Sequence, residues 1–171
     1  MSEPDIKSMI RVDQAGEYGA TRIYAGQLAI LGANSPAARS ISRMAAQEQR
    51  HRETFDRMIA ERGVRPTLLA PLWDRAGFLL GAVTALISPE AAMACTAAVE
   101  TEIDKHYADQ LAELGTAEPE LAKTIAEFKA EELEHHATAI AEGAERAPGY
   151  PLLSAAIRLG CRAAIGLSKH I

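Results

Sequence analysis

The sequence has little of what builds β-sheets, disulfide frameworks or nucleic-acid surfaces. Aromatic residues make up 5% of its 171 residues, and its two cysteines, Cys95 and Cys161, form no Cys-x-x-Cys motif. We interpret them as buried thiols in a reducing compartment. The formal net charge of −5 gives no reason to expect a nucleic-acid partner. With 48% hydrophobic residues and few β-branched runs, the composition favours helices.

Targeting segments are also missing from the pattern. The first five residues are acidic and have no apolar stretch, so no secretory signal is expected. The longest charge-free apolar run, Ala76 to Pro89, is shorter than the roughly 20 residues that a membrane span needs. We therefore expect one domain, residues 1–171, that is cytoplasmic and either soluble or peripheral.

Two Glu-x-x-His motifs stand out against this background. They are Glu48 to His51 and Glu132 to His135. Residues three apart share one face of a helix, so each carboxylate and imidazole could hold a metal ion from the same side. One such motif means little, because both residue types are common on solvated helix faces. Two of them at related positions are a much sharper signal.

Two further acids, Glu17 and Glu100, interrupt apolar helical stripes. An ionised carboxylate is costly there unless something compensates its charge. Position 17 precedes position 48 by 31 residues, and position 100 precedes position 132 by 32, so the pattern predicts a duplicated helix pair. One Glu from each of two helices and Glu-x-x-His from each of two others is the ligand set of the ferritin-like di-iron or di-manganese bundle. The mixed oxygen and nitrogen donors suit iron or manganese.

Periodicity and cap residues predict an all-α fold, a ferritin-like four-helix bundle with two added helices. The bundle helices are expected over residues 6–31, 36–62, 89–114 and 119–145, and Ser35-Pro36 and Ser88-Pro89, each an N-cap followed by proline, predict the starts of the second and third. Residues 64–88 form the crossover, which carries its own hydrophobic helix over 72–87. That helix either packs on the bundle or meets a membrane or an apolar substrate. The C-terminal amphipathic helix, about 150–170, either closes the bundle or offers its basic stripe of Arg158, Arg162 and Lys169 to anionic lipid, and these roles are compatible.

Helical position predicts how several side chains near the motifs are oriented. Glu102 lies about 200° from Glu100 around the helix, so we expect it on a solvated side. Glu131 could pair with His135, but the apolar residues place Glu132 more centrally. We expect His136 either to contact the metal ligands from outside or to lie at the surface. The three glycines of the first helix allow close helix approach, allow ligand access or are merely tolerated: Gly16, Gly19 and Gly26.

Four sequence words resemble the demethoxyubiquinone hydroxylase family of ubiquinone biosynthesis. They are RVDQAGEYGA at 11–20, AVE at 98–100, EELEHH at 131–136 and GCRAAI at 160–165. The similarity covers nearly the full chain, and generic ferritins do not share these words. Gln14 stands where the family usually has His, and Thr21 where Asn is common. Neither is an expected metal ligand.

The resemblance implies a di-iron monooxygenase that uses dioxygen and two electrons to hydroxylate the ring of a polyprenylated demethoxy-ubiquinol. Reduced nicotinamide is the implied electron source, and the absence of Gly-x-Gly-x-x-Gly argues against a tightly bound Rossmann cofactor. The six side chains that map onto the iron ligands are Glu17, Glu48, His51, Glu100, Glu132 and His135.

The resemblance also suggests roles outside the ligand set. Tyr107, two turns beyond Glu100, and His106 are candidates for proton or electron transfer; the alternative is a packed tyrosine beside an ordinary histidine. Because a polyprenyl quinol lives in the bilayer, residues 72–87 and 150–170 are expected to dock on the inner face of the cell membrane. A lipid-binding helper protein or a homo-oligomer is possible.

Other functions fit the same residues. A rubrerythrin-like or ferritin-like ferroxidase or peroxidase would use the metal pair without quinol. A non-catalytic quinone- or lipid-binding helical protein would bind quinone and consume no oxygen. A metal-free helical adaptor would have to explain four carboxylates on apolar stripes without enough Lys or Arg to pair with them.

Overall fold

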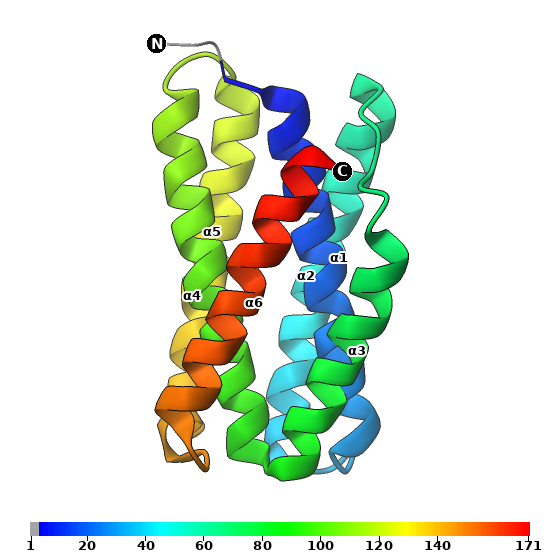
Figure 1. Ribbon diagram of the computed structural model, residues 1–171. Coiled ribbons are helices and arrows are strands. Elements are labelled where there is room, and N and C mark those ends of the chain that lie inside the picture. Colours follow the sequence, from blue (N-terminus) through cyan, green and yellow to red (C-terminus); the bar gives the residue numbers. More distant parts are fainter. Residues whose placement is uncertain (1–3) are drawn as a thin grey trace.

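The computed structural model describes residues 4–171, which form an all-helical structure (Figure 1). The expectation about a secretory signal falls partly on residues 1–3, outside this range. Six α-helices and one short 3-10 helix are present in the described part of the chain: α1 (Ile6–Ile30), α2 (Pro36–Arg62), α3 (Ala70–Ile87), α4 (Pro89–Leu114), α5 (Pro119–Ala141), η1 (Ala144–Arg146) and α6 (Tyr150–His170).

The bundle consists of α1, α2, α4 and α5, as the ferritin-like interpretation predicts. In Figure 1, α1 and α2 form one antiparallel pair, and α4 and α5 form the other. Helix α3 returns the chain along the bundle before α4 begins, so α4 runs parallel to α2. Helix α6 crosses obliquely over α4 and α1. This topology brings the two Glu-x-x-His motifs, on α2 and α5, toward one interior.

Local sequence signals set most helix ends. The Ser35 hydroxyl accepts the amide of Ala38, and the Ser88 hydroxyl accepts the amide of Ala91, which confirms both predicted Ser-Pro helix starts. Helix α5 is shorter than predicted and ends at Ala141 instead of residue 145. Gly143 adopts φ 100°, a left-handed conformation that breaks the helix and starts η1.

Helix α3 packs against α1 through glycines on both helices. A Cβ added at Gly26 would overlap the Phe78 carbonyl oxygen, and one added at Gly81 would overlap the Ile23 carbonyl oxygen. Close helix approach, one of the two uses expected for the α1 glycines, therefore applies to Gly26. At Gly16 and Gly19 an added Cβ would meet nothing within 4 Å, so close helix approach does not explain these two glycines.

The apolar segment is longer than its charge-free run indicated. Because α3 begins at Ala70, it reaches 18 residues and is long and apolar enough to cross a membrane by length and composition, with 22% of its residues buried. The expectation that this segment is too short to span a membrane is therefore wrong by length and composition. Length and composition alone do not identify a membrane-spanning helix, because core helices of soluble proteins can have the same length and composition.

Helix α4 is buried on more than one face, and the expectation for Glu102 was wrong. Residues 91–100 are all buried, and Glu102 is only 3% exposed. Its Oε1 accepts Arg158 Nε at 2.6 Å and Arg162 Nη1 at 3.1 Å, both from α6. The expectation assumed that only one side of α4 is covered by the bundle, whereas α6 covers a second side. Two of the three basic residues expected to meet lipid are therefore engaged within the protein.

Candidate metal centre and apolar cavity

The bundle interior gathers the six Glu and His side chains predicted as ligands into two overlapping groups that could hold metal ions. In each group one ligand atom per residue lies within 4.8 Å of all the others. The His51 position comprises Glu17, Glu48, His51 and Glu132, and the His135 position comprises Glu48, Glu100, Glu132 and His135. All six residues are buried. Glu48 and Glu132 belong to both groups, which is the arrangement that bridging carboxylates require.

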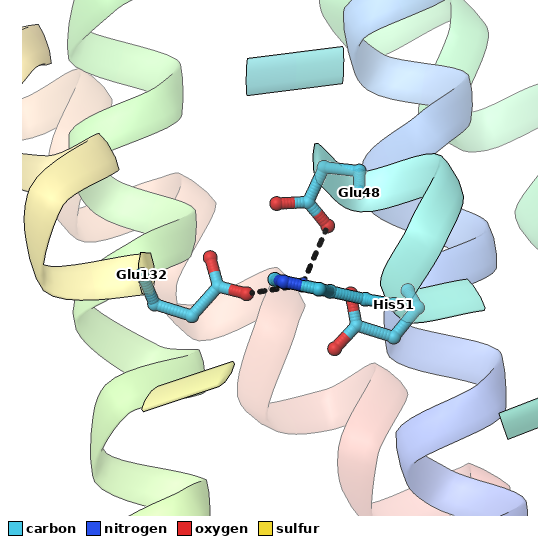
Figure 2. Close-up of side chains that lie close together, drawn as sticks. Glu48, His51 and Glu132 are labelled. Carbon is cyan, nitrogen blue, oxygen red and sulfur yellow. Dashed lines mark ion pairs between the residues drawn. The ribbon is translucent and has the colours of Figure 1, made fainter. Parts of the chain in front are cut away.

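Both imidazoles turn Nδ1 toward the acids. His51 Nδ1 lies 3.1 Å from Glu132 Oε1 and 4.0 Å from Glu48 Oε2, the two contacts drawn in Figure 2. It also lies 3.5 Å from Glu17 Oε2. On the other side, His135 Nδ1 lies 3.1 Å from Glu48 Oε1, 3.2 Å from Glu132 Oε2 and 3.7 Å from Glu100 Oε1. The glutamates shared by both positions thus lie between the two rings.

The unsatisfied atoms of this cluster fit a pair of cations. Among residues 4–171, hydrogen-bond partners are lacking for both Glu48 carboxylate oxygens, Glu17 Oε2, Glu100 Oε2, Glu132 Oε1 and His51 Nδ1. Buried polar atoms without partners are costly, and buried carboxylates are normally paired or bound to metal. Four carboxylates and two imidazoles suit two divalent iron or manganese ions.

Without metal, the carboxylates repel one another and share protons with the histidines. Burial, followed by repulsion from Glu132, raises the pKa of Glu48 well above its ordinary value and that of Glu100 to about 8. Burial alone would raise the pKa of Glu132, but the close contacts of its carboxylate with His135 and His51 lower it to about 2. Burial alone would lower the histidine pKa values, yet the surrounding carboxylates raise both to about 10.

These shifts predict that the metal-free protein loses stability as the pH rises. A group whose pKa is higher in the folded than in the unfolded protein stabilises the fold. This contribution is complete below the unfolded-state pKa and disappears as the pH rises through the folded-state pKa. The windows are 4.5 to about 8 for Glu100 and 6.5 to about 10 for the histidines. Thermal scans with a chelator should show Tm falling from pH 6 to pH 10, and Zn²⁺ should flatten the curve. A metal-free Tm that rises over this range would contradict these shifts.

Helices α1 and α4 carry one ligand glutamate each and no Glu-x-x-His motif. The glutamate of each of these helices is hydrogen-bonded by a tyrosine of the other. The Tyr24 hydroxyl of α1 donates to Glu100 Oε1 of α4 at 2.7 Å, and the Tyr107 hydroxyl of α4 donates to Glu17 of α1. Burial raises the pKa of both tyrosines well above its ordinary value, so both hydroxyls stay protonated donors. Tyr107 therefore meets Glu17 and not Glu100, the acid on its own helix.

His106 lies at the rim of the same interior. Its Nε2 is 3.1 Å from Asp13 Oδ1, which also accepts Gln110 Nε2 at 2.8 Å. Asp13 is one helical turn before Glu17, and burial raises its pKa. The His106 side chain is 12% exposed, whereas that of Asp13 is fully covered. The structure therefore places His106 between solvent and the acids of α1.

Sequence reasoning missed several side chains that contact the six. Tyr24 follows Glu17 by seven residues, as Tyr107 follows Glu100, so the duplication itself could have identified it. Gln47 and Glu131 each precede a histidine by four residues and bond the outer nitrogen of the other histidine. Glu132 is fully buried, as expected, and Glu131 is partly exposed.

An apolar cavity of about 500 Å³ lies between α1, α3, α4 and α6. Gly16 and Val99, which precede Glu17 and Glu100 in the sequence, are among its lining residues, but none of the six Glu and His side chains is. Its wall residues Ala20, Ile23 and Val99 also line a small hollow together with Tyr24 and Glu100, so this layer of α1 and α4 separates the cavity from the carboxylate cluster.

Gly19 and Gly77 also line the cavity, and a Cβ added at Gly77 would lie 3.0 Å from the Gly19 carbonyl oxygen, so Gly77 lets α3 approach α1 closely. Cys161 lines the cavity from α6. Cys161 is partly exposed, so the expectation of two buried thiols holds only for Cys95.

Polar contacts close one end of the cavity. Trp73 Nε1 of α3 donates to Ser168 Oγ of α6 at 3.1 Å, and both residues line the cavity. The Thr67 hydroxyl and the Leu68 amide both donate to the carbonyl oxygen of Ile171, at 2.7 and 3.1 Å. These bonds hold the last turn of α6 against the start of α3. The cavity is therefore bounded by helices whose ends are fixed to one another.

Comparison with known proteins agrees with this architecture. A family model described as ubiquinone biosynthesis protein COQ7 matches residues 4–168. The chain is 52% identical over 166 residues to the 3-demethoxyubiquinol 3-hydroxylase of Rhodospirillum rubrum. The aligned region covers 97% of this chain and 78% of that protein. The chain is 50% identical over 169 residues to the NADPH-dependent 3-demethoxyubiquinone 3-hydroxylase, mitochondrial, of Mus musculus, with 96% and 77% covered. The protein of the same name from Homo sapiens is 47% identical over 175 residues, with 100% and 80% covered. The resemblance found in the sequence words is thereby confirmed, and the chain belongs to the COQ7 family of ubiquinone biosynthesis proteins.

Proposed function

We propose that this protein is an oxygen-dependent monooxygenase that hydroxylates the ring of a polyprenylated demethoxy-ubiquinol. The observation that carries the proposal is the buried cluster of four carboxylates and two imidazoles, separated from an apolar cavity by a layer of side chains on α1 and α4. The names of its relatives supply the substrate and, in the words NADPH-dependent, the electron source. The six ligands are those of the His51 and His135 positions, and the ions they would hold are iron.

The reaction balances with one dioxygen, two electrons and two protons. One oxygen atom replaces a ring hydrogen as a hydroxyl group, and the other leaves as water. A bound iron pair would supply the activation of dioxygen. The chain's own residues bind the substrate, exclude bulk water and deliver protons. Reduced nicotinamide supplies the electrons from solution.

The cavity suits a quinol ring with an apolar tail. Its walls are made of small and aliphatic side chains, with Ala15, Ala20 and Ile23 on α1 and Ala156 and Ile157 on α6. Such a lining binds apolar surface by the hydrophobic effect and offers little competition from water. A ring placed beside Gly16 would lie next to the helix turn that carries Glu17. The small residues thus allow the reacting carbon to approach the metal ligands.

His106 and Tyr107 are proposed to serve proton transfer to this site. His106 contacts Asp13, and Tyr107 donates to Glu17, so both reach acids of α1, a helix that also lines the cavity. We expect His106→Gln to lower kcat roughly 100-fold, the usual scale of acid–base catalysis, with bound metal and KM unchanged. Steady-state rates together with metal analysis test this. An unchanged kcat would assign His106 a packing role.

We further propose that α3 and α6, which flank the cavity, dock on the membrane that holds the substrate. Large apolar side chains on these helices are exposed, among them Leu79, Leu86, Leu152 and Leu159. Burying one leucine is worth roughly 1.5–3 kcal/mol. We expect Leu86→Glu with Leu152→Glu to lower binding to phosphatidylcholine–phosphatidylglycerol vesicles by more than tenfold. Flotation measures this, with Leu133→Glu on α5 as the matched exposed control; equal loss in both proteins would refute docking through α3 and α6.

The function is tested by supplying iron-loaded protein with a short-tailed demethoxy-quinol, NADPH and ¹⁸O₂. We expect a product that gains one oxygen atom carrying the label. Incorporation of oxygen from water would overturn the monooxygenase assignment. Oxygen consumption that yields only oxidised iron or reduced peroxide would instead identify a ferroxidase or peroxidase. Quinol binding without oxygen consumption would leave a binding protein.

A further inference from the structure

The outer nitrogens of the two histidines are bonded by a reciprocal pair of residues. His51 Nε2 lies 2.9 Å from Glu131 Oε2, and His135 Nε2 lies 3.0 Å from Gln47 Oε1. Gln47 precedes His51 by four residues on α2, and Glu131 precedes His135 by four on α5. Each helix therefore supports the histidine of the other helix. The exchange follows the same approximate twofold symmetry as the two tyrosine–glutamate bonds.

The symmetry is broken in chemistry at this pair. The acceptor for His51 is a carboxylate, and the acceptor for His135 is a neutral amide. The two acceptors are themselves joined, because Gln47 Nε2 donates to Glu131 Oε2 at 3.4 Å. Arg50 Nη2 also donates to that oxygen, at 2.5 Å, and its side chain is 55% exposed. The carboxylate is therefore held in place by three donors and is only partly neutralised by a solvated cation.

We propose that Glu131 and Gln47 are positioning residues that make the two metal positions inequivalent, with the His51 position binding a divalent cation more tightly. The inference rests on the proposed function, since it assumes that the cluster holds metal. Both Nδ1 atoms face the carboxylate cluster, so a metal ion held there would leave the ring proton on each Nε2, which then donates outward. Neither Glu131 nor Gln47 belongs to the two ligand groups.

The physical reason is the charge of the acceptor. A carboxylate that accepts the outer N–H of an imidazole increases the basicity of the ligating nitrogen and fixes the ring orientation. An amide oxygen fixes the orientation but carries no net charge. The ligand sets of the two positions are matched: each has one histidine, one glutamate bonded by a tyrosine and the two shared glutamates. Asp13 with its partner His106 lies only on the Glu17 side, but neither contacts a ligating imidazole, whereas the outer acceptor does.

The test is titration of metal-free protein with Co²⁺ against a chelator, which gives two stepwise dissociation constants without quinol or turnover. We expect His51→Ala to remove the tighter step. Glu131→Gln should weaken that step by roughly 10- to 100-fold and leave the weaker one within about twofold. The exchange variant Gln47→Glu with Glu131→Gln should restore two separated steps, and adding His135→Ala to it should now remove the tighter one.

The matched control is Glu134→Gln, which removes an exposed carboxylate from the same helix and should change neither constant. Thermal unfolding of each metal-free variant separates loss of fold from loss of affinity. Equal weakening of both steps by Glu131→Gln, or removal of the tighter step by His135→Ala in the otherwise native chain, would overturn the proposal. If the protein gives either of these results but still binds two metal ions, only the inequivalence of the two positions is overturned and the proposed function stands. If it binds no metal ion, both the inequivalence and the proposed function are overturned.

Discussion

Glu132→Gln is expected to abolish binding at both metal positions and, with it, hydroxylation. Glu132 belongs to both ligand groups, and its two carboxylate oxygens point to different histidines, Oε1 to His51 and Oε2 to His135. Loss of an outer partner of a ligand costs roughly 10- to 100-fold in metal affinity, so loss of a shared ligand should cost more than about 100-fold. Metal analysis after desalting measures the bound ions, and product formation measures the activity.

The contrast within the ligand set makes this prediction specific. Glu17 and Glu100 each belong to one group, so Glu17→Gln and Glu100→Gln should each retain one ion. Glu134→Gln, two residues from Glu132 but exposed, should retain both. If Glu132→Gln kept as much metal as Glu17→Gln, Glu132 would not be shared, and the two positions would have to be assigned differently.

Gly19→Leu is expected to block substrate binding without disturbing the metal. Gly19 lines the cavity, and an added Cβ would meet nothing within 4 Å, so the new side chain should extend into the space proposed for the quinol. Leucine is also favoured over glycine in a helix by roughly 1 kcal/mol, so the fold should not weaken. We expect KM for the quinol to rise roughly 10- to 100-fold, which steady-state kinetics would measure.

Gly166→Leu is the matched control for this variant. It makes the same substitution within helix α6, at an exposed glycine with open space around it and outside the cavity lining. It should gain similar helix propensity and leave KM unchanged. Both variants should hold the same amount of metal as the unmodified protein. A KM for Gly19→Leu equal to that of the control would show that the substrate does not use this cavity.

The sequence predicted the fold and the ligand set well where particular residue types at a fixed spacing carry the signal. Two Glu-x-x-His motifs and two acids in apolar stripes predicted four helices with one shared interior, and the structure brings all six side chains together there. Serine–proline pairs predicted the starts of α2 and α4 within that fold. These signals are local, so they do not depend on knowing how the helices are arranged.

Contacts between helices far apart in the chain were less accessible. Glu102 was expected in solvent because one helical wheel cannot show that α6 covers a second face of α4. The tyrosine–glutamate bonds cross from α1 to α4 in both directions, whereas spacing alone had related Tyr107 to Glu100 on its own helix. The cavity depends on where α3 and α6 lie, and helical periodicity does not specify that.

The most direct test of the account is a titration of metal-free protein with Fe²⁺ in which hydroxylated product is measured at each addition. If the four carboxylates and two imidazoles hold the pair of ions that supports the reaction, product formation should rise to a plateau at two equivalents per chain. Zn²⁺ should occupy the same ligands and support no product. Full activity without added metal, or a plateau at one equivalent, would contradict the assignment of this cluster as a two-ion centre.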